Sequence, residues 1–341
     1  QVTFQKTEKE PLEAEAVIVD EMSMVDVSLF SALLRALRPG TRLVLVGDAD
    51  QLPSVGAGNV FSDLIRSKKI ETVFLREVFR QAEQSAIIRN AHRVNLGESP
   101  DLKGNQGDFF FLCRRDAQRA VSTVLELCKT RLPDNMHIPA EQIQVLTPTR
   151  KGPCGTINLN RLLQEALNPR TPGKREILWG ERVFRVGDKV MQVRNNYEIV
   201  WNRIGGEQGV GAYNGDIGIV ESINLRERSM VVRMDDRRLL YPAENLNELE
   251  IAYAITVHKS QGSEFPAVIL PVAQVPPRLC YRNLFYTGVT RARKLCVVAG
   301  RRDVVNSMMS NIRQNLRYSG LCALLQAGQP PEQLSTEGED P

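Results

Sequence analysis

The stretch that decides the fold is AVIVDEMSM, residues 16–24, in which four small or β-branched apolar residues run directly into two carboxylates. A continuous apolar run bounded by charge predicts a strand buried on both faces of a parallel sheet. Ligands of such sheets bind beyond the carboxyl ends of the strands, which is where Asp20 and Glu21 fall. Because neighbouring strand residues point in opposite directions, the two carboxylates can have different tasks. One can hold Mg²⁺ through water while the other polarises an attacking water, and the plainer alternative is a solvated acidic pair.

A second apolar run, RLVLVGD at residues 42–48, predicts another buried strand, and ADQLP at residues 49–53 follows it. The amide of Gln51 can hydrogen-bond a γ-phosphate or the water that attacks it, and it carries no charge of its own. Two strand ends with these side chains favour a site for a nucleoside triphosphate over a solvated surface.

Five motifs in family order carry a resemblance to motifs II to VI of superfamily 1 helicases, and within them to the RecD-like branch, the exodeoxyribonuclease V alpha-subunit family. They are residues 20–24, residues 47–53, VFRQ at 78–81, VHKSQGSE at 257–264 and YTGVTRAR at 286–293. The match spans nearly the whole chain. It implies an α/β fold of RecA-like parallel-sheet lobes, the first one partial, with an inserted small SH3-like β-barrel.

The resemblance also implies roles for single residues around ATP and Mg²⁺. Asp20 holds the metal, Glu21 activates the water and Gln51 senses the γ-phosphate. Arg80 and Arg291 reach the γ-phosphate from the opposite lobe. Read without the resemblance, Arg80 is a surface arginine at the entry of a helix. The remaining nucleotide contacts are Gln261 and Gly262 near the phosphates and Glu264 near the sugar.

The run QVLTPTRK at residues 144–151 predicts a strand that ends in hydroxyls and bases, and glycines follow at 152 and 155. Such side chains beside backbone amides can track a phosphodiester backbone, and a plain strand–loop–helix connection is the alternative. The family resemblance places the DNA contacts at Thr147, Thr149, Arg150, Asn158, Asn160, Thr256, His258 and Ser260. His258 has no second histidine at ligand spacing, which argues against a metal site there.

Residues 181–247 change character, because short strands separated by Gly and Asn-Gly turns replace the helices. This spacing predicts a small antiparallel barrel, and the segment resembles the SH3-like barrel inserted in RecD-like helicases. We expect Arg194 and Arg203 to contact single-stranded DNA, together with Tyr197. Trp201 suits either the DNA surface or the barrel core.

These observations predict four regions in the chain. Residues 1–75 form the carboxyl-terminal part of the first lobe, residues 76–180 and 248–326 the second lobe, residues 181–247 the barrel, and residues 327–341 a disordered tail rich in Pro, Glu and Gly.

Composition places the chain among ordinary globular proteins, with 341 residues, 42% hydrophobic residues, 25% charged residues and a net charge of +4. A nucleic-acid site must therefore be a local groove and not a globally basic surface. The sequence has no signal peptide and no apolar stretch near the ~20 residues of a membrane helix. Its six scattered cysteines predict reduced thiols in a cytoplasmic protein and no zinc site.

The sequence contains no Gly-x-x-x-x-Gly-Lys-Ser/Thr phosphate-binding loop. The glycine-bearing loops at residues 56–59 and 152–156 supply neither the lysine nor the neighbouring hydroxyl that grip phosphate and Mg²⁺. Since the chain begins at Gln1 and its first strand already belongs to motif II, we expect the loop to lie upstream of this sequence.

The leading interpretation is an ATP-dependent DNA helicase or translocase motor of recombination and repair, incomplete here. The resemblance implies 5′-to-3′ movement on single-stranded DNA, ATP and Mg²⁺ as cofactors, and possible partners among helicase–nuclease subunits. One alternative is a DNA-binding module without ATPase activity. Another is the back half of a conjugative relaxase–helicase, whose nicking domain would carry an N-terminal tyrosine and a three-histidine cluster.

A first prediction follows from the missing loop. The 341-residue chain alone will not hydrolyse ATP measurably, because the γ-phosphate lacks its lysine. Phosphate release from the purified chain, measured with and without single-stranded DNA, checks this, and DNA-stimulated release would contradict it.

Overall fold

The computed structural model describes residues 4–75, 84–103, 107–203, 205–312 and 319–328. The chain divides into two compact units. The first unit comprises residues 1–79 together with 312–341, and the second unit comprises residues 80–311. Arg80 and the rest of the VFRQ motif lie outside the described residues. None of the described helices combines the length and the apolar character of a membrane span.

The first unit is built on two parallel strands, β1 (Ala16–Val19) and β2 (Arg42–Leu45). Between them runs helix α1 (Val27–Ala36), which begins where the carboxylate of Asp26 accepts a hydrogen bond from the backbone N–H of Leu29 at 2.8 Å. Helix α2 (Val60–Ser67) follows β2. The strand–helix–strand order is the one predicted from the sequence.

The prediction that both faces of β1 and β2 are buried is wrong. Both strands alternate between exposed and half-buried residues, and Ile18 is 71% exposed. In the described part of this unit, the apolar cluster around Met22, Val60 and Leu64 packs against Val19. One face of the sheet therefore has a helical layer and the other presents β-branched side chains to solvent.

Helix α10 (Leu321–Ala327) belongs to the first unit, although the sequence analysis assigned residues up to 326 to the second lobe. Its side chains Leu321 and Leu325 pack against the Met22 cluster, and α10 lies beside α2. The helix belongs to this unit because its apolar side chains are covered by packing against α2.

The second unit contains a five-stranded sheet in the order β14-β4-β15-β16-β3, in which all neighbours are parallel. The strands are β3 (Phe109–Cys113), β4 (Ile143–Thr147), β14 (Ala254–Thr256), β15 (Phe265–Val272) and β16 (Ala292–Gly300). All five carboxyl ends therefore lie along one edge of the sheet, which we call the carboxyl edge.

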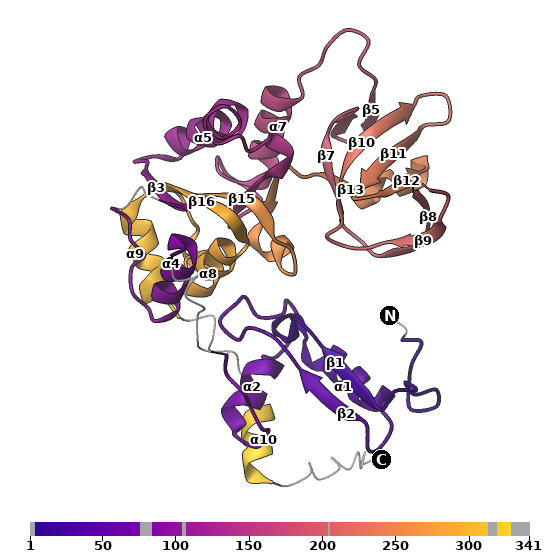
Figure 1. Cartoon of the computed structure of the whole chain (residues 1–341), viewed down its shortest axis with the longest axis vertical. Helices are drawn as coiled ribbons and strands as arrows, with labels where there is room; N and C mark the ends of the chain where they lie inside the picture. The colour runs from indigo at the N-terminus through magenta and orange to yellow at the C-terminus, as the bar shows by residue number, and fades with distance from the viewer. Residues whose placement is uncertain (1–3, 76–83, 104–106, 204, 313–318, 329–341) are drawn as a thin grey trace, which may run out of the picture. The chain divides into compact units, whose positions relative to one another are not determined.

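Helices cover both faces of this sheet, with α5 and α7 on one side and α4, α8 and α9 on the other (Figure 1). Their bounds are α4 (Ala86–Asn95), α5 (Ala117–Glu126), α7 (Thr156–Leu167), α8 (Arg282–Thr290) and α9 (Arg302–Ser310). On β16, Leu295 and Val297 join the core beneath α5, whereas Cys296 and Val298 face the opposite way and are also buried. Burial on both faces produces the continuous apolar runs seen in the sequence.

Shorter elements complete the unit. A π-helical segment (Leu127–Arg131) and α6 (Leu132–Met136) extend α5, and short 3-10 turns lie at Met22–Met24 in the first unit and at Ala140–Gln142, Ala243–Glu248, Val257–Ser260 and Pro277–Leu279 in the second.

The inserted segment forms an antiparallel seven-stranded sheet in the order β13-β7-β10-β11-β12-β8-β9. Its strands are β7 (Lys189–Gln192), β8 (Asn196–Arg203), β9 (Gln208–Ala212), β10 (Ile217–Asn224), β11 (Ser229–Met234), β12 (Arg237–Tyr241) and β13 (Leu249–Ile251). The hairpin β5 (Glu176–Trp179) and β6 (Arg182–Arg185) precedes it. The core contains fully buried Val232, Leu239 and Tyr241, and Trp201 packs partly buried against it. The prediction of a small antiparallel domain is confirmed.

A buried carboxylate connects this antiparallel domain to the parallel sheet. Asp188 is fully buried and accepts hydrogen bonds from the side chains of Gln164 (2.6 Å), Asn168 (2.7 Å) and Tyr253 (3.1 Å) and from the backbone of Arg185 (2.7 Å). Burial raises the pKa of Asp188, and these donors act against that rise. Every side of the carboxylate is thus satisfied within the protein.

The neighbouring Lys189 is also buried and donates to the backbone carbonyls of Glu141 and Ile143, both at 3.1 Å. Burial lowers the pKa of Lys189 to about 8. The unfolded chain therefore holds this proton more tightly than the folded chain between pH 8 and the ordinary value of 10.5. Folding stability consequently rises with pH across this window.

A second prediction uses Lys189→Met, which removes this titration. The free energy of unfolding of the unchanged protein should rise relative to that of the variant by about 2 kcal/mol between pH 7.5 and pH 9.5. Urea unfolding at both pH values measures the difference. Lys129→Met, at an exposed position, is the control and should show no such rise. A constant difference between the unchanged protein and Lys189→Met would contradict the prediction.

Candidate nucleotide and nucleic-acid sites

The ends of β1 and β2 are held together closely in the first unit. The backbone N–H of Met22 donates to the carbonyl of Val46 at 3.0 Å. A Cβ atom on Gly47 would lie 3.0 Å from the Met22 nitrogen and 3.2 Å from the ring of Phe61. A glycine at this position therefore permits the two chemistry-bearing loops to approach each other.

Asp20 and Glu21 leave the strand end in different conformations. One oxygen of Asp20 accepts the backbone N–H of Glu21 at 2.8 Å. Glu21 has φ 53° and ψ 40°, in the left-handed region. For a residue with a side chain this conformation costs about 1–2 kcal/mol, and such strain gathers at functional sites. Both residues lie beyond the end of β1, and the division of tasks between the two carboxylates stays a prediction.

The loop after β2 is organised by Asp48. One carboxylate oxygen accepts the backbone N–H of Asp50 at 2.9 Å, and the other accepts the side-chain amide of Gln51 at 3.3 Å. Gln51 is 8% exposed, so its orientation is fixed. This role of Asp48 was not predicted from the sequence, although a carboxylate that closely follows an apolar strand was the available signal.

In the second unit, motif V and motif VI meet at the beginning of β16. The guanidinium of Arg291 donates to the carbonyl of Ser263 at 3.2 Å, and the carbonyl of Arg291 accepts the backbone N–H of Phe265 at 2.8 Å. Arg293 donates to the carboxylate of Glu264 at 2.6 Å. In the turn at residues 261–264, Gly262 has φ +74°, a left-handed conformation that favours glycine. The structure therefore brings the turn at 261–264 together with Arg291.

Arg291 is a buried cation with an incomplete set of partners. It is 5% exposed, and its Nε has no hydrogen-bond partner. Its other donors reach the carbonyl of Ser263 and the hydroxyl of Thr290, and no carboxylate of the described residues forms an ion pair with it. A buried charge without a counter-ion is costly, so the site is suited to receive an anion.

Three of the eight second-lobe residues predicted to contact DNA are engaged inside the protein. The hydroxyl of Thr147 is buried and donates to the carbonyl of Cys154 at 2.6 Å. The amide of Asn160 bonds the carbonyls of Ile251 and Ala254, and Ser260 donates to the carbonyl of Val257. These side chains shape the loops at the carboxyl edge, and their contact with DNA stays a prediction.

The other five lie nearer the surface. Arg150 has a side chain 62% exposed, Thr149 donates to the carbonyl of Lys151, and Asn158 donates to the carbonyl of Pro153. Thr256 caps the turn at Val257–Ser260, on which the half-buried His258 lies. Because β4 and β14 are neighbours, the structure brings these two segments together.

Glu250 was missed by the sequence analysis and connects these segments. Its carboxylate bonds Lys259 at 2.8 Å and lies 3.4 Å from Arg150 and 3.6 Å from Arg182. Partial burial alone would raise the pKa of Glu250, but the hydrogen bond and charge of Lys259, with the two arginines, hold it below its ordinary value. No local pattern marks this residue, because two of its three partners, Arg150 and Arg182, come from distant segments.

The two arginines predicted on the barrel differ in their surroundings. Arg203 bonds Glu207 at 2.6 Å and Asp236 at 2.9 Å, and its guanidinium lies 5.3 Å from the centre of the Trp201 ring. Arg194 is exposed and has no ion pair within the described ranges. Arg194 is therefore the more available of the two for a phosphate.

No group of three or more His, Cys, Asp or Glu side chains suited to a metal ion occurs among the described residues. The six cysteines are free thiols.

Three family models match the chain. They are an AAA domain at residues 4–108, an ATP-dependent RecD-like DNA helicase SH3 domain at residues 159–234, and a UvrD-like helicase C-terminal domain at residues 251–299. The Pif1 helicase from Bacteroides, solved with ADP-AlF3 and single-stranded DNA, matches with a TM-score of 0.51 and 18% identity, over 96% of this chain and 79% of that one. This likeness shows the fold alone. Fold and models together define the parallel-sheet α/β fold of RecA-like helicases with an SH3-like insertion.

Relatives narrow the assignment. The ATP-dependent RecD2 DNA helicase of Deinococcus radiodurans is 35% identical over 297 residues, which is 87% of this chain and 38% of that protein. The RecBCD enzyme subunit RecD of Mycobacterium tuberculosis is 30% identical over 338 residues, 95% of this chain and 56% of that protein. Over most of its length the chain is similar to RecD-like helicases, the family that its motifs resemble, and it spans about half or less of the length of these relatives.

A third prediction compares two buried arginines. Arg291→Met should raise the free energy of unfolding by about 1 kcal/mol, because it removes a buried charge without a counter-ion. Arg185→Met is the matched control. The Arg185 side chain is 9% exposed but paired with Glu165 at 2.7 Å and Glu176 at 3.3 Å, so its loss should cost about 3 kcal/mol. Denaturant unfolding of both variants measures this, and equal destabilisation would show that Arg291 is a structural cation.

Proposed function

We propose that this chain is the motor part of an ATP-dependent DNA helicase that moves along single-stranded DNA. The observation that carries the proposal is the buried guanidinium of Arg291, which lacks a carboxylate among the described residues and lies against the turn at 261–264. The relatives named as ATP-dependent RecD2 helicase and as RecD support the same activity. ATP use is common to this family, and the assignment of single residues is our own proposal.

Asp20 fits a Mg²⁺ ion in its chemistry. One oxygen is occupied by the Glu21 N–H, and the side chain is exposed at a strand end, so the other oxygen can meet a metal-bound water. Magnesium in phosphoryl-transfer sites is held by one or two carboxylates together with water and phosphate oxygens, so a single carboxylate suffices. When bound, the ion neutralises charge on the phosphates.

The other nucleotide residues are assigned by their positions. Glu21, turned out of the strand, accepts a proton from the attacking water and orients it. Gln51, fixed by Asp48, bonds that water or the γ-phosphate. Arg291 stabilises the charge that develops on the γ-phosphate, and we assign Arg80 to the same task.

For single-stranded DNA we propose the exposed Arg150 and the half-buried Thr149 and His258 at the carboxyl edge, with the exposed Arg194 on the barrel. Binding should be moderate and salt-sensitive, because phosphate neutralisation dominates it. Movement in the 5′-to-3′ direction is part of the proposal through the family resemblance alone. Association with helicase–nuclease subunits is proposed because relatives are named as RecBCD subunits.

A fourth prediction tests the assignment of the base. The experiment joins these residues to a segment that carries the Gly-x-x-x-x-Gly-Lys-Ser/Thr loop and introduces Glu21→Gln. DNA-stimulated ATP hydrolysis should fall by about 10²–10⁴-fold, because the amide keeps the hydrogen bonds but cannot accept a proton. Binding of a labelled ATP analogue should be unchanged.

Glu15→Gln is the matched control, since Glu15 is exposed just before the same strand. It should hydrolyse ATP at the unchanged rate. Full turnover by Glu21→Gln would reject Glu21 as the base. Absence of DNA-stimulated hydrolysis in the unchanged joined protein would favour the DNA-binding module without ATPase activity.

A further inference from the structure

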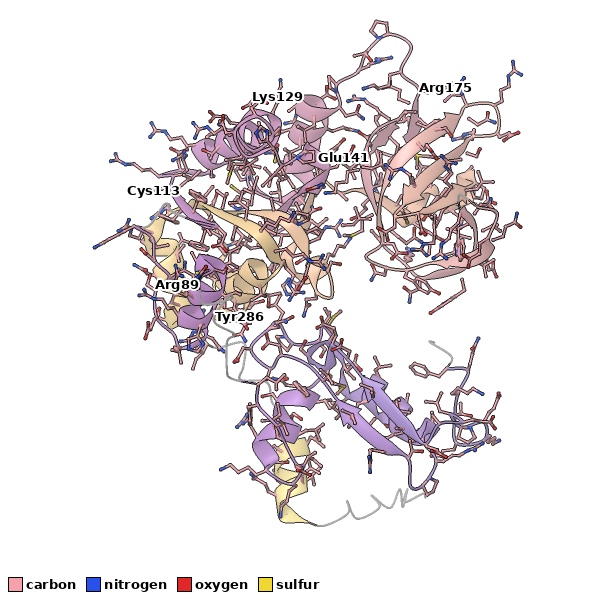
Figure 2. The ribbon with its side chains drawn as sticks, in the orientation of Figure 1. Arg89, Cys113, Lys129, Glu141, Arg175 and Tyr286 are labelled. Atoms are coloured by element: carbon pink, nitrogen blue, oxygen red, sulfur yellow. The ribbon has the colours of Figure 1, made fainter. Side chains whose placement is uncertain are left out.

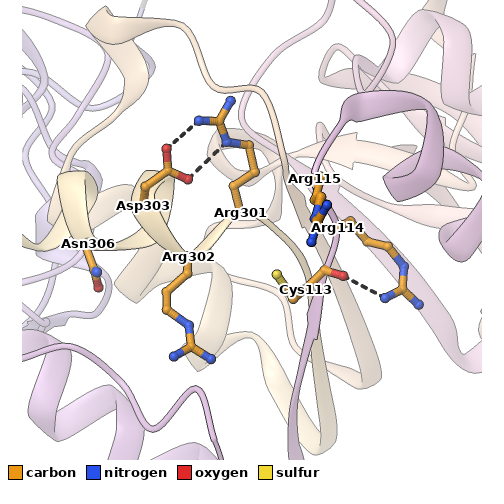
Figure 3. Close-up of a pocket in the computed structure, with 7 residues that line it drawn as sticks. All are labelled: Cys113, Arg114, Arg115, Arg301, Arg302, Asp303 and Asn306. Atoms are coloured by element: carbon orange, nitrogen blue, oxygen red, sulfur yellow. Dashed lines mark hydrogen bonds and ion pairs between the residues drawn. The ribbon is translucent and has the colours of Figure 1, made fainter.

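A pocket of about 670 Å³ opens at the carboxyl ends of β3 and β16, away from the motifs described above. The side chains that line it come from the last residue of β3 and from the residues that follow β3 and β16 (Figure 3). They are Cys113, Arg114, Arg115, Arg301, Arg302, Asp303 and Asn306. An adjoining hollow of about 580 Å³ shares Arg114 and Arg115 and continues along α5 past Arg119.

The place of the pocket in the sheet follows from topology. Strands β3 and β16 are parallel neighbours, yet the chain continues from β3 into α5 on one face and from β16 into α9 on the other (Figure 1). Where two adjacent strands send their connections to opposite faces, a crevice forms at their carboxyl ends, and ligands of parallel sheets bind there. We call this crevice the switch-point pocket.

The charge of the switch-point pocket is strongly positive. Four arginines and one carboxylate line it, and no aromatic side chain is among its lining residues. Arg115 is exposed and has no hydrogen bond or ion pair within the described part of the chain. The guanidinium of Arg114 donates a hydrogen bond to the carbonyl of Cys113 at 2.8 Å. The guanidinium of Arg302 lies 6.0 Å from the centre of the Phe111 ring. Planar guanidinium groups without a base-stacking surface suit phosphate groups.

Asp303 is the internal anion of this pocket. Its carboxylate faces Arg301 with two hydrogen bonds, one of them from Nε at 3.0 Å (Figure 3). The pair is exposed, with side chains 47% and 64% accessible, so water competes for it and an incoming phosphate can replace the carboxylate. The arginine geometry for an oxyanion therefore already exists in the pocket.

The same edge of the sheet carries the predicted DNA contacts. Strand β4, which ends at Thr147, lies three strand positions from β3, which ends at Cys113. At about 4.8 Å per position, the switch-point pocket lies about 14 Å along the carboxyl edge from the loop after β4. That distance corresponds to about four stacked nucleotides at about 3.4 Å each.

We propose that the switch-point pocket binds the phosphodiester backbone of single-stranded DNA and extends the contact made by the loop after β4. This proposal rests on the proposed function, because it assumes that the ligand bound at Arg150 is single-stranded DNA. It assigns Arg115 and Arg301 to phosphates outside the helicase motifs.

The test measures binding of fluorescently labelled oligothymidylates to the 341-residue chain by anisotropy over a range of salt concentrations. One oligonucleotide has about four nucleotides and the other about sixteen, the lower and upper range of a single-strand site. The pocket variant is Arg115→Ala with Arg301→Ala. The matched control is Lys129→Ala with Arg226→Ala, which removes the same charge from exposed positions outside the pocket (Lys129 is labelled in Figure 2).

The pocket variant should bind the long oligonucleotide about tenfold more weakly, with a salt slope lower by about 1.4, which is about 0.7 for each lost phosphate contact. Its binding of the short oligonucleotide should match that of the control. Asp303→Asn should act in the opposite direction, with tighter binding and a steeper salt slope, because it frees Arg301.

Equal affinities and slopes for the pocket variant and the control would overturn the proposal, as would an unchanged slope in Asp303→Asn. If the proposal fails in either way but Arg150→Ala weakens binding of both oligonucleotides, the proposed function stands and only the role of the switch-point pocket is rejected. Failure of the unchanged chain to bind either oligonucleotide would overturn both. A pocket variant that loses only the binding of a polyglutamate peptide would assign the arginines to an acidic protein partner and reject DNA.

Discussion

The second unit depends on one buried carboxylate. Asp188 accepts hydrogen bonds from α7, from the residue before β14 and from the antiparallel domain itself, so it holds three parts of the chain at once. A buried charge left without these donors would be strongly destabilising. The three parts of the chain that supply the donors must therefore be in place together. The loops that carry Thr149 and His258 belong to the elements fixed in this way. The orientation of the proposed DNA surface is therefore set from inside the protein.

Sequence patterns predicted the parallel strands of the second unit well, because burial on both faces leaves a continuous apolar run. Residues 109–113 and 267–272 show this pattern, and the structure has strands there. Strands β8 and β9 were missed, because β8 (NYEIVWNR) mixes polar and aromatic residues and β9 (QGVGA) is rich in glycine. Their side chains face solvent on one side, so the strand conformation depends on pairing with neighbouring strands. No local apolar pattern in the sequence therefore predicts these two strands.

The nucleotide residues were accessible to sequence reasoning for a related reason. Asp20, Glu21 and Gln51 lie within a few residues of strand ends, so spacing along the chain already places them at an edge. Glu250 acts through Arg150 and Arg182, which only the fold brings near, and the pairing of Arg203 with Asp236 likewise became visible only in three dimensions. The motif arginine at position 80 remains a prediction, since it lies outside the described residues.

The packing of α10 on α2 has a consequence for the order of folding. The helix that completes the first unit is encoded almost a whole chain length after the strands it supports. Contacts between such distant segments form slowly, since a long loop must close before they contribute. During synthesis the second unit has all its residues available before α10 emerges. Until α10 is made, part of the apolar surface of the first unit stays exposed to solvent. In the cell, chaperone binding and aggregation compete with folding during this interval.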